Sequence, residues 1–133
     1  MEVPTFISRM NIEQLRAFCL SLPKVTEDVK WGNDLCFLIA GKMFCVTGTG
    51  GNMMTSFKCD EEDFTELCER DGIIPAPYMA RNKWVQVQKT SALSKSEWEA
   101  YINKSFRLVA SKLPKKTQKE LGLVELKFVN RES

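Results

Sequence analysis

The sequence contains no histidine, and this absence says more about catalysis than any residue that is present. Serine and cysteine nucleophiles commonly use a histidine base, and most catalytic zinc sites need imidazole ligands. The absence of histidine therefore largely excludes these catalytic mechanisms for this protein. We expect a protein that is not an enzyme and that carries neither a cofactor nor a metal ion.

Long apolar runs and an export signal are also missing from the sequence. Residues 1–12 show no basic segment followed by a continuous apolar one, and no window approaches the roughly 20 apolar residues of a membrane span. The five cysteines form an odd set without a C-x-x-C pair, so we expect reduced thiols that pack as small apolar side chains. These features predict a cytoplasmic protein that does not bind a membrane.

The length and composition are those of one globular domain. The chain has 133 residues, of which 44% are hydrophobic and 27% are charged, and both values are close to the globular average. They exclude wholesale disorder and make one hydrophobic core the default. We expect a single domain over residues 1–121 and a C-terminal tail over residues 122–133, with a candidate added strand at Val124–Val129.

Two predicted helices begin with a capping box, in which two side chains three positions apart bond each other's backbone amides. Asn11 and Gln14 open the first helix, which Pro23 ends. Ser94 and Glu97 open the longest helix. Apolar residues at helical spacing follow both boxes, so each helix is expected to bury one face.

From residue 26 to residue 58 the hydrophobic pattern changes to a period of two, which is typical of strands. A turn at Gly41-Lys42 would pair Ile39 with Phe44. Both faces of this hairpin would be apolar, one with Phe37, Ile39, Phe44 and Val46, the other with Cys36, Leu38, Met43 and Cys45. Either the chain itself or a partner subunit would cover them. The predicted strands are Thr26–Trp31, Leu35–Ala40, Met43–Thr47, Met53–Lys58 and Trp84–Gln88.

These elements predict an α+β fold with two layers, in which helices pack on an antiparallel β-sheet. The segment over residues 73–77 is expected to be an extended connector, because its prolines disfavour helix at the preceding residues. After Pro114 the chain either breaks or begins a short helix through Leu121. The tryptophans Trp31, Trp84 and Trp98 either stack on nucleic-acid bases or lie in the core, and we expect the core.

Charge is unevenly distributed along the chain, although the net charge is only +2. Residues 60–71, a predicted helix capped by Asp60, carry seven acidic side chains and one arginine. Residues 79–119 carry ten basic side chains and two glutamates. The basic segment is either a surface for nucleic-acid phosphates or a solvated face paired with the acidic helix.

Three short segments resemble a known family. They are Lys58-Cys59-Asp60, the run Pro77-Tyr78-Met79-Ala80-Arg81-Asn82-Lys83-Trp84, and Lys112-Leu113-Pro114-Lys115. With these segments in this order along the chain, the sequence resembles the MmcQ/YjbR family from about Asn11 to Leu121. The resemblance implies a CyaY-like α+β fold. It also implies DNA binding, because members are described as candidate DNA-binding proteins with a double-wing arrangement of β-hairpins.

Three hypotheses for function follow. The first is non-catalytic DNA binding, mainly through the phosphate backbone. The second is a protein-interaction module or homodimer that uses the apolar hairpin face. The third, a small-molecule site or an enzyme, would need a pocket near Tyr78, Trp84 and Lys58. The candidate DNA contacts are Lys42, Lys58, Arg81, Lys83, Lys112, Lys115, Lys116 and Lys119.

Overall fold

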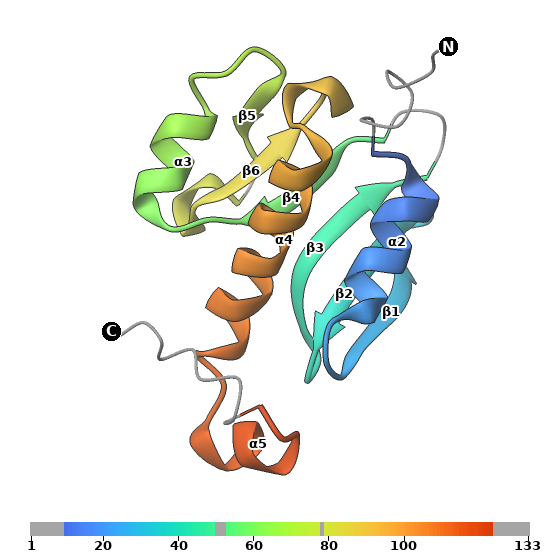
Figure 1. Ribbon diagram of the computed structural model, residues 1–133, viewed down its shortest axis with the longest axis vertical. Helices are drawn as coiled ribbons and strands as arrows, with labels where there is room; N and C mark the ends of the chain where they lie inside the picture. Colours follow the sequence, from blue (N-terminus) through green and yellow to red (C-terminus); the bar gives the residue numbers. More distant parts are fainter. Residues whose placement is uncertain (1–9, 50–52, 78, 124–133) are drawn as a thin grey trace.

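The computed structural model describes residues 10–49, 53–77 and 79–123 and shows an antiparallel six-stranded sheet with helices α2 and α4 on one face (Figure 1). The strand order is β1-β2-β3-β4-β6-β5. The predicted α+β class and antiparallel sheet are therefore confirmed. The strands are β1 Val25–Lys30, β2 Asp34–Ile39, β3 Lys42–Gly48, β4 Thr55–Lys58, β5 Ile73–Pro75 and β6 Trp84–Val87. The helices are α2 Ile12–Ser21, α3 Glu61–Leu67, η1 Ala80–Asn82, η2 Thr90–Ala92, α4 Lys95–Ala110 and α5 Lys115–Glu120.

Helices α2 and α4 begin at the predicted capping boxes. The Asn11 side chain accepts a hydrogen bond from the Gln14 amide at 2.8 Å, and the Asn11 amide donates to Gln14 Oε1 at 3.1 Å. Ser94 and Glu97 make the same exchange at 3.2 and 3.0 Å. Helix α5 follows Pro114, which decides between the two alternatives at this proline. None of the helices in the described part of the chain is long and apolar enough to cross a membrane.

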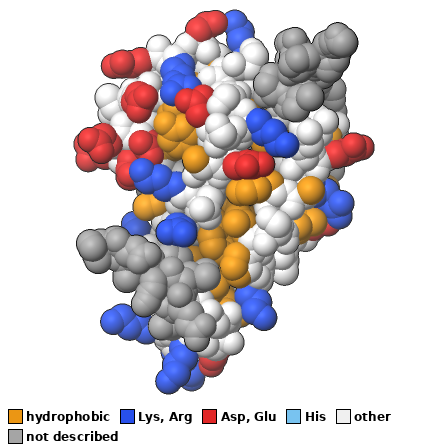
Figure 2. All heavy atoms as spheres, in the orientation of Figure 1, with side chains coloured by type: hydrophobic (Ala, Val, Ile, Leu, Met, Phe, Trp, Pro, Cys, Tyr) orange, Lys and Arg blue, Asp and Glu red, His pale blue; other side chains and the backbone are white. Residues whose placement is uncertain are grey.

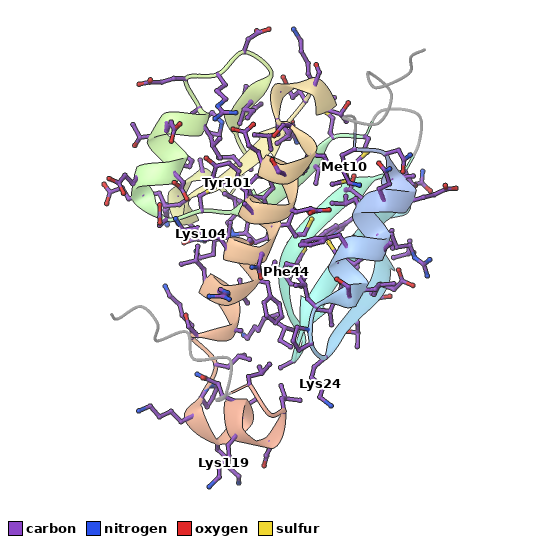
Figure 3. The ribbon with its side chains drawn as sticks, in the orientation of Figure 1. Met10, Lys24, Phe44, Tyr101, Lys104 and Lys119 are labelled. Atoms are coloured by element: carbon purple, nitrogen blue, oxygen red, sulfur yellow. The ribbon has the colours of Figure 1, made fainter. Side chains whose placement is uncertain are left out.

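The main core lies between the sheet and helices α2 and α4. Figure 3 shows Phe44 between α4 and the sheet, and its ring meets that of Phe106 edge to face with 5.5 Å between the centroids. Each large apolar side chain buried here contributes about 1.5–3 kcal/mol. All five cysteines are free thiols, and each is buried except Cys68, which is half-buried. Their predicted role as small packing residues is confirmed.

The tip of the β2–β3 hairpin is Ala40-Gly41, one residue earlier than the predicted Gly41-Lys42 turn. Its two residues have φ values of 52° and 79°, which is the backbone of a type I′ turn. Farther along, Phe37 pairs with Cys45, and Phe44 is the extra residue of a β-bulge. The predicted turn and the predicted pairing of Phe44 are therefore wrong.

The bulge also changes which side chains share a face of the hairpin. Phe44 and Cys45 both lie in the main core, and Val46 lies on the opposite face. The prediction placed Cys45 and Val46 the other way round, because it assumed an uninterrupted alternation. Ala76 and Met79, from the connection between β5 and β6, pack on the second face. The chain itself thus supplies cover for both faces.

One further expectation from the sequence is wrong, and one is incomplete. Trp31 is 69% exposed in the loop between β1 and β2, whereas Trp84 and Trp98 are buried as predicted. The connector over residues 73–77 contains β5, which pairs with β6. The candidate strand at Val124–Val129 and Tyr78 lie outside the described residues.

Candidate functional site

The β3–β4 ladder ends at a serine side chain that comes from α4. Cys45 and Phe57 are the last pair of this ladder, and the next pair in the same register would join the Lys58 amide to the Phe44 carbonyl. The hydroxyl of Ser105 lies between these two groups. It accepts from the Lys58 amide at 3.0 Å and donates to the Phe44 carbonyl oxygen at 2.6 Å. The serine thus replaces a direct bond between the strands and separates them at this end of the sheet.

A cavity of about 480 Å³ lies at this end, and three lysines line it. Lys42 comes from the start of β3, Lys58 from the end of β4, and Lys112 from the turn after α4. Among the described residues, no acidic side chain lines this cavity. The other lining residues are Met43, Asn82, Trp84, Val109 and Leu113. We call this site the lysine cavity.

Lys58 is the half-buried lysine of the three. Its Nζ donates a hydrogen bond to the Asn82 carbonyl at 2.9 Å, which fixes the position of the ammonium group. Burial lowers the pKa of Lys58, and the positive charge of Lys112 lowers it further. Both effects disfavour the charged form of Lys58, and an anion between the two lysines would oppose both.

The acidic segment of the chain pairs with a different set of cations. Lys104 lies 2.7 Å from a carboxylate oxygen of Asp63 and 2.9 Å from one of Asp60, and these contacts raise its pKa. Lys89 Nζ donates to a carboxylate oxygen of Asp71 at 2.8 Å. By contrast, none of the eight candidate DNA contacts forms an ion pair with a described residue.

The other candidate contacts lie in two places. Helix α5 follows the lysine cavity in the chain and exposes Lys115, Lys116 and Lys119. Lys83 lies away from this group, since its Nζ sits 5.2 Å from the centroid of the Phe64 ring on α3. Arg81 is exposed in η1 and does not line the cavity. The structure therefore gathers three candidates in the cavity and three on α5, and leaves two on the η1 segment.

Opposite charges gather at different ends of the molecule. Figure 2 shows acidic side chains over α3 and mostly basic side chains around α5. Figure 3 places Lys119 at the α5 end and Lys104 close to α3. The acidic helix thus neutralises cations of its own neighbourhood and leaves the α5 end positive.

Two residues that shape the cavity were missed from the sequence. Ser105 interrupts the buried apolar stripe of α4, next to Phe106 and three positions after Ile102. A polar residue at such a position is a detectable signal, because it needs a buried partner. Asn82 acts through its backbone carbonyl, and its side chain gives no comparable signal.

The model of the family described as YjbR matches residues 20–108, which include Lys42 and Lys58. No curated protein matches the chain. Among solved structures, the chain is similar to the crystal structure of the Deinococcus radiodurans protein DR2400, described with the domain DUF419, at 26% identity. The two superpose with a TM-score of 0.78 over 86% of this chain and 90% of that one. The family match covers more than half of the chain, and the structural likeness extends over most of it, so this protein belongs to the YjbR family.

Proposed function

We propose that this protein binds DNA without catalysing a reaction, and that it does so mainly through the phosphate backbone. The observation that carries the proposal is the position of Lys58. Its ammonium group is half-buried and close enough to Lys112 for the two charges to interact, and no described acidic side chain lines the cavity that they share. Two like charges in a partly desolvated site are unfavourable on their own. A phosphate group, with its charge and several acceptor oxygens, would relieve this repulsion.

Helix α5 favours a chain of phosphates over a single anion. A single phosphate in the lysine cavity would leave its three exposed lysines unused. A DNA backbone would place one phosphate in the cavity and further phosphates along α5. Lysine contacts of this kind fix the position of the protein on DNA and carry little sequence information, so we expect binding that depends weakly on sequence.

The charge separation of the molecule would orient it on DNA. The acidic side chains of α3 repel phosphates, whereas the α5 end attracts them. Encounter with DNA would therefore occur through the α5 end. This orientation depends on charge and weakens as salt screens the potential.

The test is a titration of fluorescently labelled duplex and single-stranded DNA, followed by anisotropy at several salt concentrations. Lys42→Gln and Lys112→Gln should each weaken binding and each reduce the slope of log affinity against log salt by about one. The matched control is Lys95→Gln, which makes the same chemical change at the first residue of α4. Because α4 has 16 residues, Lys95 lies about 24 Å from the end that leads to Lys112.

Two results would contradict the proposal. One is the absence of binding to both DNA forms at low salt. The other is binding that Lys42→Gln and Lys112→Gln weaken no more than Lys95→Gln does. Thermal unfolding of each variant checks that a loss of binding is not a loss of fold.

A further inference from the structure

A second hollow, of about 780 Å³, lies on the face of the sheet opposite the helices, where β3, β4 and β6 run side by side. Its volume falls within the range of about 300–1,000 Å³ that is usual for small-molecule sites. It shares no lining residue with the lysine cavity. The lining residues are Trp31, Asn33, Asp34, Val46, Thr47, Gly48, Thr49, Met54, Ser56, Pro77, Met79 and Gln86. We call this site the sheet hollow.

The floor of the sheet hollow contains a buried hydroxyl group that has no hydrogen-bond partner among the described residues. Val46, Ser56 and Gln86 are directly opposite one another on β3, β4 and β6. Ser56 is only 6% exposed, and its hydroxyl makes no hydrogen bond to any described residue. Buried hydroxyl groups are almost always hydrogen-bonded, so this one is expected to bind a group that enters the hollow. The neighbouring Gln86 amide has a free N–H₂ group among the described residues, since only its oxygen is engaged, by Gln88.

The aromatic ring of Trp31 lies at the rim of the sheet hollow, where both its exposure and its backbone conformation are unfavourable. Trp31 is 69% exposed, and its φ of 50° lies in the left-handed region that favours glycine. Strained backbone and exposed aromatic surface at the mouth of a hollow point to a binding role. The loop that carries Trp31 is held in place, because Thr49 Oγ1 donates to the Asn33 carbonyl at 2.7 Å.

The charge of the sheet hollow differs from that of the lysine cavity. Asp34 is the one charged residue in its described lining, and it forms no ion pair with a described residue. A carboxylate accepts hydrogen bonds from amino groups and repels anions. The hollow therefore selects against phosphates and carboxylates.

We propose that the sheet hollow binds an uncharged heteroaromatic ring of nucleobase size that carries an amino group. The ring stacks on Trp31, its polar edge bonds to Ser56 and Gln86, and its amino group donates to Asp34. Such a ring comes either from a free small molecule or from an unpaired base of single-stranded DNA. The proposal does not depend on DNA binding by the lysine cavity, because the two sites have no residue in common.

The test uses adenine as the probe and the backbone amide NMR signals of Ser56 and Gln86 as the reporters. We expect saturable shifts of these signals, and a weaker response to purine, the same ring system without the amino group. Trp31→Asn should weaken adenine binding about tenfold through the loss of stacking. Asp34→Asn should reduce the preference for adenine over purine. Neither variant should change the affinity for duplex DNA, which separates this proposal from the previous one.

A second probe, a single-stranded adenine oligonucleotide, distinguishes the two sources of the ring. Shifts with free adenine support a small molecule, and shifts with the oligonucleotide alone support an unpaired base; both support the ring chemistry. Three outcomes overturn the proposal. They are no shift with either probe, shifts that persist unchanged in Trp31→Asn and Ser56→Ala, and concentration-dependent shifts without a probe, which would place a second copy of the chain in the hollow.

Discussion

At Trp31 the chain combines a large exposed ring with a left-handed backbone. Each feature costs free energy, and the described contacts of the loop do not require tryptophan there. Asparagine tolerates the left-handed region better, so Trp31→Asn should raise the free energy of unfolding by about 0.5–1 kcal/mol. Urea denaturation measures this change. Val29→Thr is the control, because Val29 is also exposed but has a strand backbone, and it should stay within about 0.5 kcal/mol of the wild type. A clear destabilisation by Trp31→Asn would mean that the ring holds the loop.

Individual lysines show what the sequence could and could not predict. The clustering of basic side chains after residue 79 was visible in the sequence, and so was the acidic segment before it. The candidate contacts from the sequence included Lys112 and left out Lys104, but no sequence signal showed that Lys104 pairs with Asp60 and Asp63 while Lys112 lines the cavity. Both lie on or beside α4, and their difference comes from the position of α3 in space. The packing of the helices therefore decides which lysines form ion pairs with acidic side chains and which do not.

At the scale of elements, Ser105 joins α4 to strands β3 and β4 beside the lysine cavity. Ser105→Ala would leave the Lys58 amide and the Phe44 carbonyl without their shared partner, both next to the core. We expect the free energy of unfolding to fall by about 1–3 kcal/mol. The control is Ser111→Ala, since the Ser111 hydroxyl is exposed and its one hydrogen bond to a described residue goes to the Leu108 carbonyl at its own helix end. Equal stabilities of the two variants in chemical denaturation would show that Ser105 does not hold the strands.

Helix ends were predictable from the sequence because their signals are local. A capping box needs only residues three positions apart, as for Asn11 with Gln14, and both predicted boxes form. The β2–β3 register was not predictable in this way. Its bulge is at Phe44, whose carbonyl bonds to Ser105 at a separation of 61 positions in the chain. β5 was missed for a related reason, because three extended residues become a strand only when β6 pairs with them.

At the scale of the whole molecule, the fold places two chemically different sites on one sheet. The lysine cavity lies at the end of the sheet where β3 and β4 separate. The sheet hollow lies on the face of these strands that the helices do not cover. One is cationic, and the other has a carboxylate as its charged group. The fold class was predicted from the sequence, but these positions were not, because each depends on side chains from at least three elements. We therefore expect an anionic ligand and a neutral one to bind the same molecule without competing.

The pH dependence of DNA affinity tests whether the lysine cavity contacts phosphate in the intact protein. The pKa of Lys58 lies below its ordinary value of 10.5 in the free protein, because of burial and the charge of Lys112. A bound phosphate favours the ammonium form and raises that pKa. DNA affinity should therefore be full below the free-protein pKa of Lys58 and begin to fall as pH rises through it. Arginine stays charged over this range, so Lys58→Arg should abolish this early decline, and Lys95→Arg should retain it. Anisotropy titrations across alkaline pH measure the effect, and the same decline in Lys58→Arg would show that Lys58 does not contact the phosphate.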